Sequence, residues 1–303
     1  MVNIEQLDYL VEAAKTGSIS KAAQNLHVSQ STISKSIQKL EHDTGVKMFT
    51  RSKSGVVPTA IGKQLIVKAG EIHRRIQEFN QIVNEHTGVG NHRIRIGSVD
   101  VFSGVLSRAL EDLMQQYPQT QIEYNVKVSG EILEAFQRNS LDLAFTVINS
   151  ELKRQKDLVF KEILEVRQCA LVNKNSPLAD KPHLTPEDIV GQRIIMHNGN
   201  SAYFESFTSR GYSMTTNNIE AIRSVVERSS AISFLSELTV NNYSLLRSGN
   251  IIAKPLIVNG NEMTMKIAWV KLKTTVLSKA CRELLHRLKQ LTTPDHTEAA
   301  ALS

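Results

Sequence analysis

Residues 18–41 read SISKAAQNLHVSQSTISKSIQKLE, and this stretch decides the fold of the N-terminal part of the chain. It predicts a short helix from about Ser20, a tight turn at His27-Val28 and a second helix capped by Ser29. In the second helix Ile33, Ile37 and Leu40 fall on one stripe, as expected of side chains that face a core. The opposite face is polar and nearly free of acid, and on it or at its flanks stand Gln30, Ser31, Ser34, Lys35, Gln38 and Lys39. Such side chains donate to base edges and phosphates in the major groove, so the pattern predicts a helix that reads double-stranded DNA.

The segments on either side complete a winged helix-turn-helix. Before this stretch, Asn3 is placed to cap a helix that Gly17 ends. After it, Gly45 stops the reading helix, and residues 46–58 predict two short strands around a basic turn. We expect this wing to place Arg51, Lys53 and Ser54 against phosphates or in the minor groove, although an ordinary surface hairpin has the same pattern.

The charge of the chain is concentrated in this N-terminal part. The net charge is +6, but residues 15–75 alone carry +8, which leaves −2 for the rest. A basic block on a nearly neutral remainder indicates a polyanionic partner for the block alone.

The same residues resemble a known family. Residues 7–10, 18–41, Gly45, 49–51 and 59–62 are similar to the signature of LysR-type transcription regulators, almost without a break over about the first 65 residues. The resemblance implies that Gln30, Ser31, Ser34 and Lys35 read the groove and that residues 51–54 are wing contacts. Lys35 stands where the family often has arginine, and lysine donates as a point charge without the guanidinium fork.

Residues 59–87 predict a long helix that begins after Thr59. Its apolar residues recur with heptad-like spacing at Ile61, Leu65, Ala69, Ile72, Ile76, Phe79 and Val83. This seam favours dimerisation over the alternative that it packs on its own DNA-binding domain, and the resemblance implies pairing through this helix, with a tetramer also expected. Residues 88–91 then read as a hinge.

From His92 onward, predicted strands and helices alternate. This pattern predicts α/β domains with parallel sheets, behind an all-α winged helix-turn-helix in residues 1–58. The family resemblance implies two Rossmann-like subdomains, similar to periplasmic binding proteins: residues 92–162 with 268–292, and residues 163–267. Crossover strands are expected near 160–165 and 263–268, and a disordered tail at 293–303.

Ligands of open α/β sheets bind beyond the carboxyl ends of strands, where helix N-termini favour anions. By the family pattern, the residues at these places line an effector cleft: Ser98, Asp100, Ser103, Ser129, Thr146, His197, Asn200 and Ser201. We expect a small, anionic effector, with Asp100 opposing an anion or binding an amine of the same ligand. Each hydroxyl can equally be a helix cap and nothing more, and a lone histidine such as His197 is more often structural.

The sequence contains no motif of an active site, so we expect no enzyme, no cofactor and no metal. Cys169 and Cys281 match no redox or metal spacing and are expected to be reduced thiols of a cytoplasmic protein. An opening apolar segment and a membrane-length run are both missing, so neither export nor a membrane is expected. The competing class is a solute-binding protein or α/β enzyme whose N-terminal block only oligomerises; the polar face of residues 31–38 argues against it.

Overall fold

The computed structural model describes residues 2–52, 55–87, 92–138, 140–198, 203–204, 207 and 213–292. The expected hinge at 88–91 and the tail from 293 lie outside these residues, as do Lys53, Ser54, Asn200 and Ser201. The chain divides into two units, residues 1–92 with 134–140 and residues 93–133 with 141–303, and each is described by itself.

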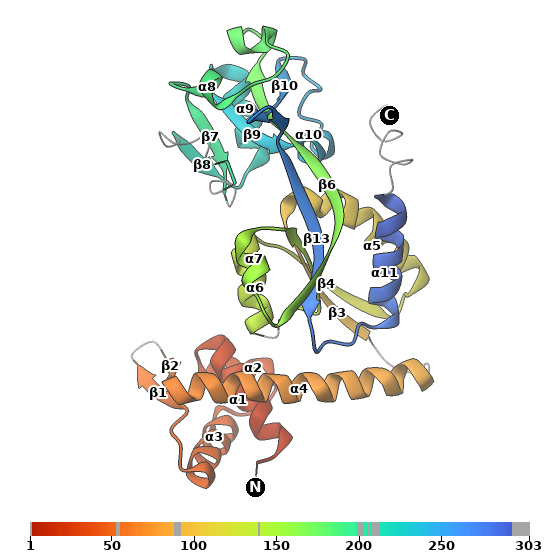
Figure 1. The fold of residues 1–303 in the computed structure, drawn as a ribbon. Helices are drawn as coiled ribbons and strands as arrows, with labels where there is room; N and C mark the ends of the chain where they lie inside the picture. The colour runs from red at the N-terminus through yellow and green to blue at the C-terminus, as the bar shows by residue number, and fades with distance from the viewer. Residues whose placement is uncertain are drawn as a thin grey trace. The chain divides into compact units, whose positions relative to one another are not determined.

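The N-terminal unit combines short helices, a hairpin and one long helix (Figure 1). Its elements are α1 (Ile4–Thr16), α2 (Ile19–Asn25), α3 (Gln30–Thr44), β1 (Phe49–Ser52), β2 (Gly55–Pro58) and α4 (Ala60–Thr87). The expected caps are confirmed: Asn3 forms a capping box with Gln6, and Ser29 caps α3. Gly17 and Gly45 end their helices in the left-handed conformation, with φ of 63° and 69°.

Two adjoining clusters of apolar side chains hold this unit together. One joins α1, α2 and α3 through Tyr9, Ala13, Ala22, Ala23, Ile33 and Ile37. The other joins α1 and α3 to the long helix through Leu10, Leu40, Met48 and Ala69. The alanines of α2 let the helices approach closely, and the predicted stripe of α3 is buried, with Ile33 and Leu40 at most 1% exposed.

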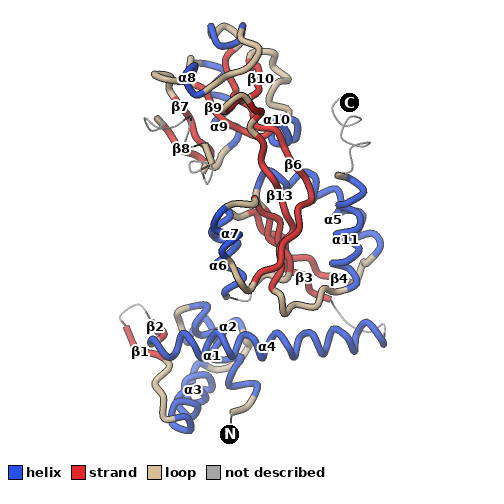
Figure 2. The backbone as a smooth tube through the Cα atoms, in the orientation of Figure 1, coloured by secondary structure: helices blue, strands red, loops and turns tan. Residues whose placement is uncertain are grey.

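The α/β unit has two lobes joined by a pair of long strands, shown as red tubes in Figure 2. Lobe I contains β3 (His92–Ser98), η1 (Asp100–Phe102), α5 (Ser103–Gln116), β4 (Thr120–Val126), α6 (Ser129–Gln137), β5 (Leu143–Val147), α7 (Ser150–Arg154) and α11 (Lys279–Leu291). Lobe II contains η2 (Pro177–Asp180), α8 (Pro186–Ile189), β7 (Ile194–His197), β8 (Met214–Thr216), α9 (Ile219–Arg228), β9 (Ile232–Ser236), α10 (Glu237–Asn242), β10 (Ile251–Pro255), β11 (Ile257–Val258) and β12 (Asn261–Glu262). The joining strands are β6 (Leu158–Asn173) and β13 (Thr264–Leu272).

The joining strands make the sheet mixed rather than parallel. Its order is β4-β3-β5-β13-β6-β9-β7-β8, with β10 also paired to β6. The expectation of parallel pairing holds for β3 with β5 and for β7 with β8 and β9. It is wrong for β6 and β13, which run antiparallel to each other and to their other described neighbours. One strand carries the chain out of lobe I and the other brings it back, so the two must point in opposite directions. They lie where the crossovers were expected.

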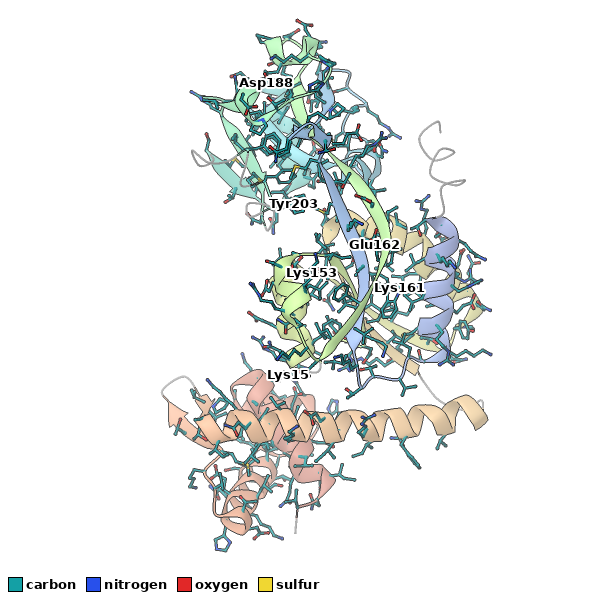
Figure 3. All side chains as sticks on the ribbon, in the orientation of Figure 1. Lys15, Lys153, Lys161, Glu162, Asp188 and Tyr203 are labelled. Atoms are coloured by element: carbon teal, nitrogen blue, oxygen red, sulfur yellow. The ribbon has the colours of Figure 1, made fainter. Side chains whose placement is uncertain are left out.

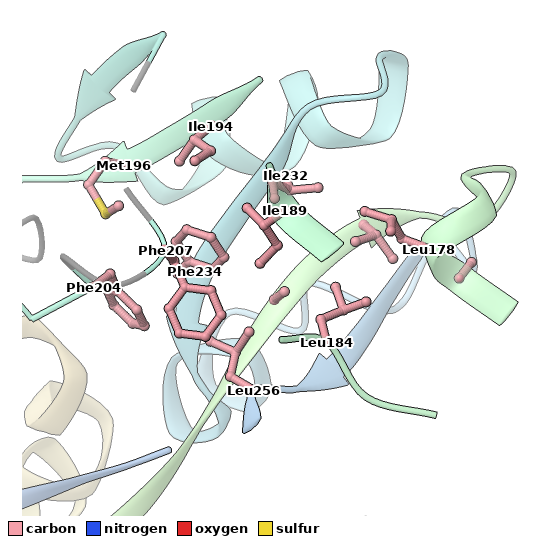
Figure 4. Close-up of a cluster of buried hydrophobic side chains, with 13 residues drawn as sticks. Leu178, Leu184, Ile189, Ile194, Met196, Phe204, Phe207, Ile232, Phe234 and Leu256 are labelled. Carbon is pink, nitrogen blue, oxygen red and sulfur yellow. The ribbon is translucent and has the colours of Figure 1, made fainter. Parts of the chain in front are cut away.

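Each lobe has its own apolar core. In lobe I, Phe102 and Phe145 are both fully buried, with ring centroids 5.2 Å apart. In lobe II, Phe204, Phe207 and Phe234 pack together at 5.1–5.3 Å, surrounded by buried aliphatic side chains (Figure 4). A second cluster, centred on Ile222, Val226 and Leu235, covers the other face of the lobe II strands. Among the helices the structure describes, we find none whose length and apolar character suit a membrane span.

Candidate nucleic-acid interface and effector site

The outer face of α3 presents most of the residues predicted to read DNA. Gln30, Ser31, Lys35, Gln38 and Lys39 are exposed, and Ser34 is half-buried. In the part of the chain that the structure describes, Lys35 and Lys39 form no ion pair. The face therefore offers two positive charges and several hydrogen-bonding side chains, with no carboxylate among them.

Hydrogen bonds fix the start of this helix. Ser20 Oγ of α2 donates to Gln30 Oε1 at 2.9 Å, which leaves the amide NH2 of Gln30 available to donate. Ser29 Oγ accepts from the backbone N–H of Thr32 and lies 2.7 Å from Ser31 Oγ. The first turn of α3 is therefore held before any contact with DNA is made.

Glu41 plays a part that the sequence did not reveal. It is 8% exposed, and its carboxylate points inward from the end of α3. Its Oε1 accepts from the backbone N–H groups of Met48 and Phe49 at 2.8 and 3.1 Å, and its Oε2 accepts from Lys47 Nζ at 2.7 Å. Burial alone raises the pKa of this carboxyl, but the hydrogen bonds from Lys47 and the two N–H groups outweigh it and lower the pKa. Glu41 thus fastens the start of the hairpin to α3.

The wing is an antiparallel hairpin of β1 and β2, with Arg51 opposite Val56 in the register. Val56 N–H donates to Gly17 O at 2.9 Å, which ties β2 to the turn between α1 and α2. Gly55 has φ +135°, and a Cβ there would lie 2.1 Å from Gly17 O, so only glycine fits this approach. The expected wing residues Lys53 and Ser54 lie outside the described residues, and Arg51 is placed here only by its backbone.

The apolar seam of α4 serves two purposes along its length. In its first turns, Leu65 and Ala69 pack against the core of the N-terminal unit, which is the alternative to dimerisation considered above. His73 Nδ1 lies 2.5 Å from Asp8 Oδ1 and joins the middle of α4 to α1. Beyond that point Phe79 is 67% and Val83 42% exposed, and Ile72, directly before His73, is 46% exposed.

Of the residues expected to line the effector cleft, those that the structure describes lie at the carboxyl ends of the lobe I strands and of β7. Two of the serine hydroxyls donate to backbone carbonyls: Ser98 Oγ donates to Val99 O at 2.9 Å, and Ser103 Oγ donates to Asp100 O at 2.6 Å. Thr146 Oγ1 donates to Ser129 Oγ at 3.0 Å, and Ser129 begins α6. Because Ser129 accepts here, its own hydroxyl hydrogen remains available for a ligand. His197 ends β7 and is half-buried.

The structure brings further residues to this edge that the sequence did not single out. Tyr243 follows α10 of lobe II, and its hydroxyl donates to Asp100 Oδ1 of lobe I at 3.1 Å. Tyr124 of β4 belongs to the same cluster: burial raises its pKa to about 12, and the charge of Asp100 and the nearby Tyr243 add to the rise. No motif marks these tyrosines, and only their place at strand and helix ends could have drawn attention to them.

Comparison with known proteins agrees with both units. The family model "Bacterial regulatory helix-turn-helix protein, lysR family" matches residues 4–63, and the model "LysR substrate binding domain" matches residues 87–292. The HTH-type transcriptional regulator YvbU of Bacillus subtilis is 23% identical over 252 residues, covering 80% of this chain and 85% of that protein. MetR of Escherichia coli is 26% identical over 199 residues, covering 65% of this chain and 61% of MetR.

Solved structures show the same fold along almost the whole chain. A full-length OxyR variant from Pseudomonas aeruginosa superposes with a TM-score of 0.75 at 18% identity, covering 95% of each chain. CbnR complexed with its target DNA superposes with a TM-score of 0.52 at 16% identity, covering 96% of this chain and all of that one.

The winged helix-turn-helix and the two-lobed α/β unit define a DNA-binding transcription regulator with an effector-binding domain, and not an enzyme. The chain belongs to the LysR family.

Proposed function

We propose that this regulator binds promoter DNA by inserting α3 into the major groove, N-terminus first. The contacts with bases and phosphates would come from Gln30, Ser31, Ser34, Lys35, Gln38 and Lys39, and those of the wing from Arg51, Lys53 and Ser54. The observation that carries the proposal is the exposed, acid-free face of α3, whose first residue is already held by Ser20. Such a regulator works where the chromosome is, so we place it in the cytoplasm.

The test is DNA binding by the variant Ser34→Ala/Lys35→Ala on the DNA upstream of the protein's own gene. Lys289→Ala, which removes one exposed lysine from α11 of the other unit, is the control for charge. We expect the double variant to lose at least about tenfold in affinity for the specific site while the control binds as the wild type does. Unchanged binding by the double variant would contradict the assignment of α3.

The exposed part of the α4 seam supports a dimer through residues 59–87. Phe79 and Val83 lie beyond the section of the helix that packs on its own unit, and an apolar stripe of this kind on a long helix pairs readily with a second copy. Two DNA-binding units per dimer would read two half-sites. A tetramer would follow from further contacts between dimers.

We propose that the effector carries an anionic group that binds at the N-terminus of α6. The helix dipole and the free N–H groups there favour a carboxylate or a phosphate, and the Ser129 hydroxyl, held by Thr146, has its hydrogen left to donate. Asp100 would then face an amine of the same ligand. His197, Asn200 and Ser201 would contact it from lobe II, and Ser98 and Ser103 would shape the edge.

Thermal unfolding in the presence of a panel of small carboxylates, amino acids and inorganic phosphate tests this site. Binding to the folded state raises the midpoint temperature of unfolding, and at a given concentration a tighter ligand raises it more. We expect stabilisation by an anionic compound in the wild type, and a smaller effect in Ser129→Ala. A panel in which only cationic compounds stabilise the protein would contradict the anionic class.

A further inference from the structure

The two lobes of the α/β unit are joined by the two strands β6 and β13. β6 and β13 pair along their length, but their register shifts between Ile267 and Ala268, where Ile267 faces Leu164 and Ala268 faces Glu162. Figure 3 labels Glu162 on this stretch of β6, between the lobes. A register shift bends a strand pair and interrupts its ladder. The angle between the lobes therefore depends on contacts outside the two strands.

One such contact lies between η1 and the start of α5 in lobe I and the end of α10 in lobe II. Tyr243 Oη donates to Asp100 Oδ1 at 3.1 Å across 143 positions of sequence. Hydrogen bonds to a charged acceptor are stronger than neutral ones. In the described part of the chain, Asp100 takes part in no ion pair, so Tyr243 is its principal partner.

A second contact between the lobes lies one helical turn after Asp100, at the start of α5. Gly104, the second residue of α5, lies so close to Asn242 that a Cβ on it would be 2.5 Å from the amide atoms of that side chain. Asn242 is the last residue of α10 and directly precedes Tyr243. The absence of a side chain at position 104 therefore lets the two lobes meet at this point.

The end of α10 is built firmly enough to hold these side chains in place. Ser244 has φ +50°, the left-handed conformation that commonly ends a helix but that serine seldom adopts. The N–H of Ser244 donates to Asn241 O at 3.1 Å, and that of Leu245 donates to Val240 O at 3.1 Å. Leu245 is 1% exposed, which anchors the turn in the lobe II core.

We propose that these two contacts form a latch that holds the lobes in one arrangement and thereby sets the DNA-binding state of the regulator without effector. We call the residues Asp100, Gly104, Asn242 and Tyr243 the lobe latch. The latch adjoins Ser98 and the edge assigned above to the effector, so a ligand that engages Asp100 competes with Tyr243. The role of the lobe latch in DNA binding rests on the proposed function, whereas its role in fixing the angle between the lobes does not.

The test is single-molecule energy transfer between dyes on the two lobes of the full-length protein. Cysteines introduced at the exposed positions Glu111 of lobe I and Gln192 of lobe II carry the dyes, and excess unlabelled protein leaves one labelled copy in each assembly. Cys169 and Cys281 are buried and do not compete for the dyes.

Two variants open the latch by different means, and each has a matched control. Tyr243→Phe removes only the hydroxyl; its control is Tyr117→Phe, whose hydroxyl makes no hydrogen bond within the described residues. Gly104→Leu inserts a side chain against Asn242; its control, Ser107→Leu, adds the same side chain at an exposed position of the same helix. We expect both latch variants to gain a second population of different transfer efficiency, about three- to tenfold more occupied than in the wild type, and both controls to match the wild type.

Latch variants whose distributions match the wild type would overturn the proposal, and so would a shift in the controls as large as in the variants. Affinity for the gene's own upstream DNA, measured on the same proteins, tests the coupling. A change in affinity that follows the shift in lobe geometry supports the latch as a regulatory device, and unchanged affinity overturns that part. A wild type that binds no DNA site specifically would instead contradict the proposed function, while the lobe measurement stands.

Discussion

The hydroxyl of Ser20 donates a 2.9 Å hydrogen bond to Oε1 of Gln30, and so α2 orients the first side chain of α3, the helix proposed to read DNA. Without this hydrogen bond, the Gln30 side chain would have to be ordered when the protein binds DNA, and the lost conformational entropy would weaken the affinity.

We expect Ser20→Ala to weaken binding to the specific site by about three- to tenfold, as for loss of one net hydrogen bond, and to leave binding to random DNA unchanged. Fluorescence anisotropy with both DNAs measures this. A double-mutant cycle with Gln30→Ala isolates the pair: Ser20→Ala should have almost no effect when Gln30 is already gone. Equal losses in both backgrounds would contradict the positioning role.

Glu41 makes the N-terminal unit sensitive to acid. Its pKa is lower in the folded protein than the ordinary 4.5, so the folded state binds fewer protons than the unfolded chain. The stabilisation is therefore complete above the ordinary pKa and is lost as the pH falls through the lowered one.

We expect Glu41→Gln to lower the free energy of unfolding by about 1–3 kcal/mol at neutral pH, because Lys47 and two backbone N–H groups lose a charged acceptor. The difference from the wild type should shrink below about pH 4.5. Denaturant unfolding followed by circular dichroism over the acid range measures both curves. Curves that run parallel down to the lowest pH would contradict the role of Glu41.

The exposed end of the α4 seam gives a prediction for assembly. The side chain of Phe79 is 67% exposed in one copy, so Phe79→Asp should change the free energy of unfolding of the isolated unit little. The free energy of dimerisation should weaken by at least about 1.5–3 kcal/mol for each Phe79 that the dimer buries. We expect the dimer to dissociate at micromolar concentration in sedimentation experiments. Asn80→Asp, the same charge one position off the seam, should leave the mass unchanged. A dimer that survives Phe79→Asp would mean that the copies pair elsewhere.

The two thiols should take no part in signalling. Burial raises the pKa of Cys169 and of Cys281 to about 12, and neither side chain is more than 8% exposed. Thiolates are the reactive form, so both residues should resist a disulfide reagent while the protein is folded and react on unfolding. Peroxide should leave DNA affinity unchanged. Loss of affinity in peroxide, reversed by Cys169→Ala or Cys281→Ala, would contradict this.

The sequence predicted the N-terminal unit closely because local signals determine it. Asn3, Ser29 and Thr59 cap helices, Gly17 and Gly45 end them, and the stripe of Ile33, Ile37 and Leu40 is buried as expected. The inward turn of Glu41 was missed because it depends on the backbone of Met48 and Phe49, which the hairpin brings back to α3.

The α/β unit was less predictable because its decisive contacts are distant in sequence. β8 and α10 are short and lack a clear apolar period, so neither was anticipated. The antiparallel β6 and β13 were expected in position but not in direction, since direction follows from the return of the chain to lobe I. Asp100 was named as a candidate effector residue, but its partner Tyr243 stands 143 positions away and carries no motif.

The central claim is that the outer face of α3 reads a DNA sequence. The most direct measurement is fluorescence anisotropy of the full-length protein on the DNA upstream of its own gene, titrated across salt concentration and compared with random DNA of equal length. We expect a steep loss of affinity with salt, from phosphate contacts, and a specific site bound at least about 10³ times more tightly than random DNA. Equal, weak binding to both DNAs at every salt concentration would contradict it.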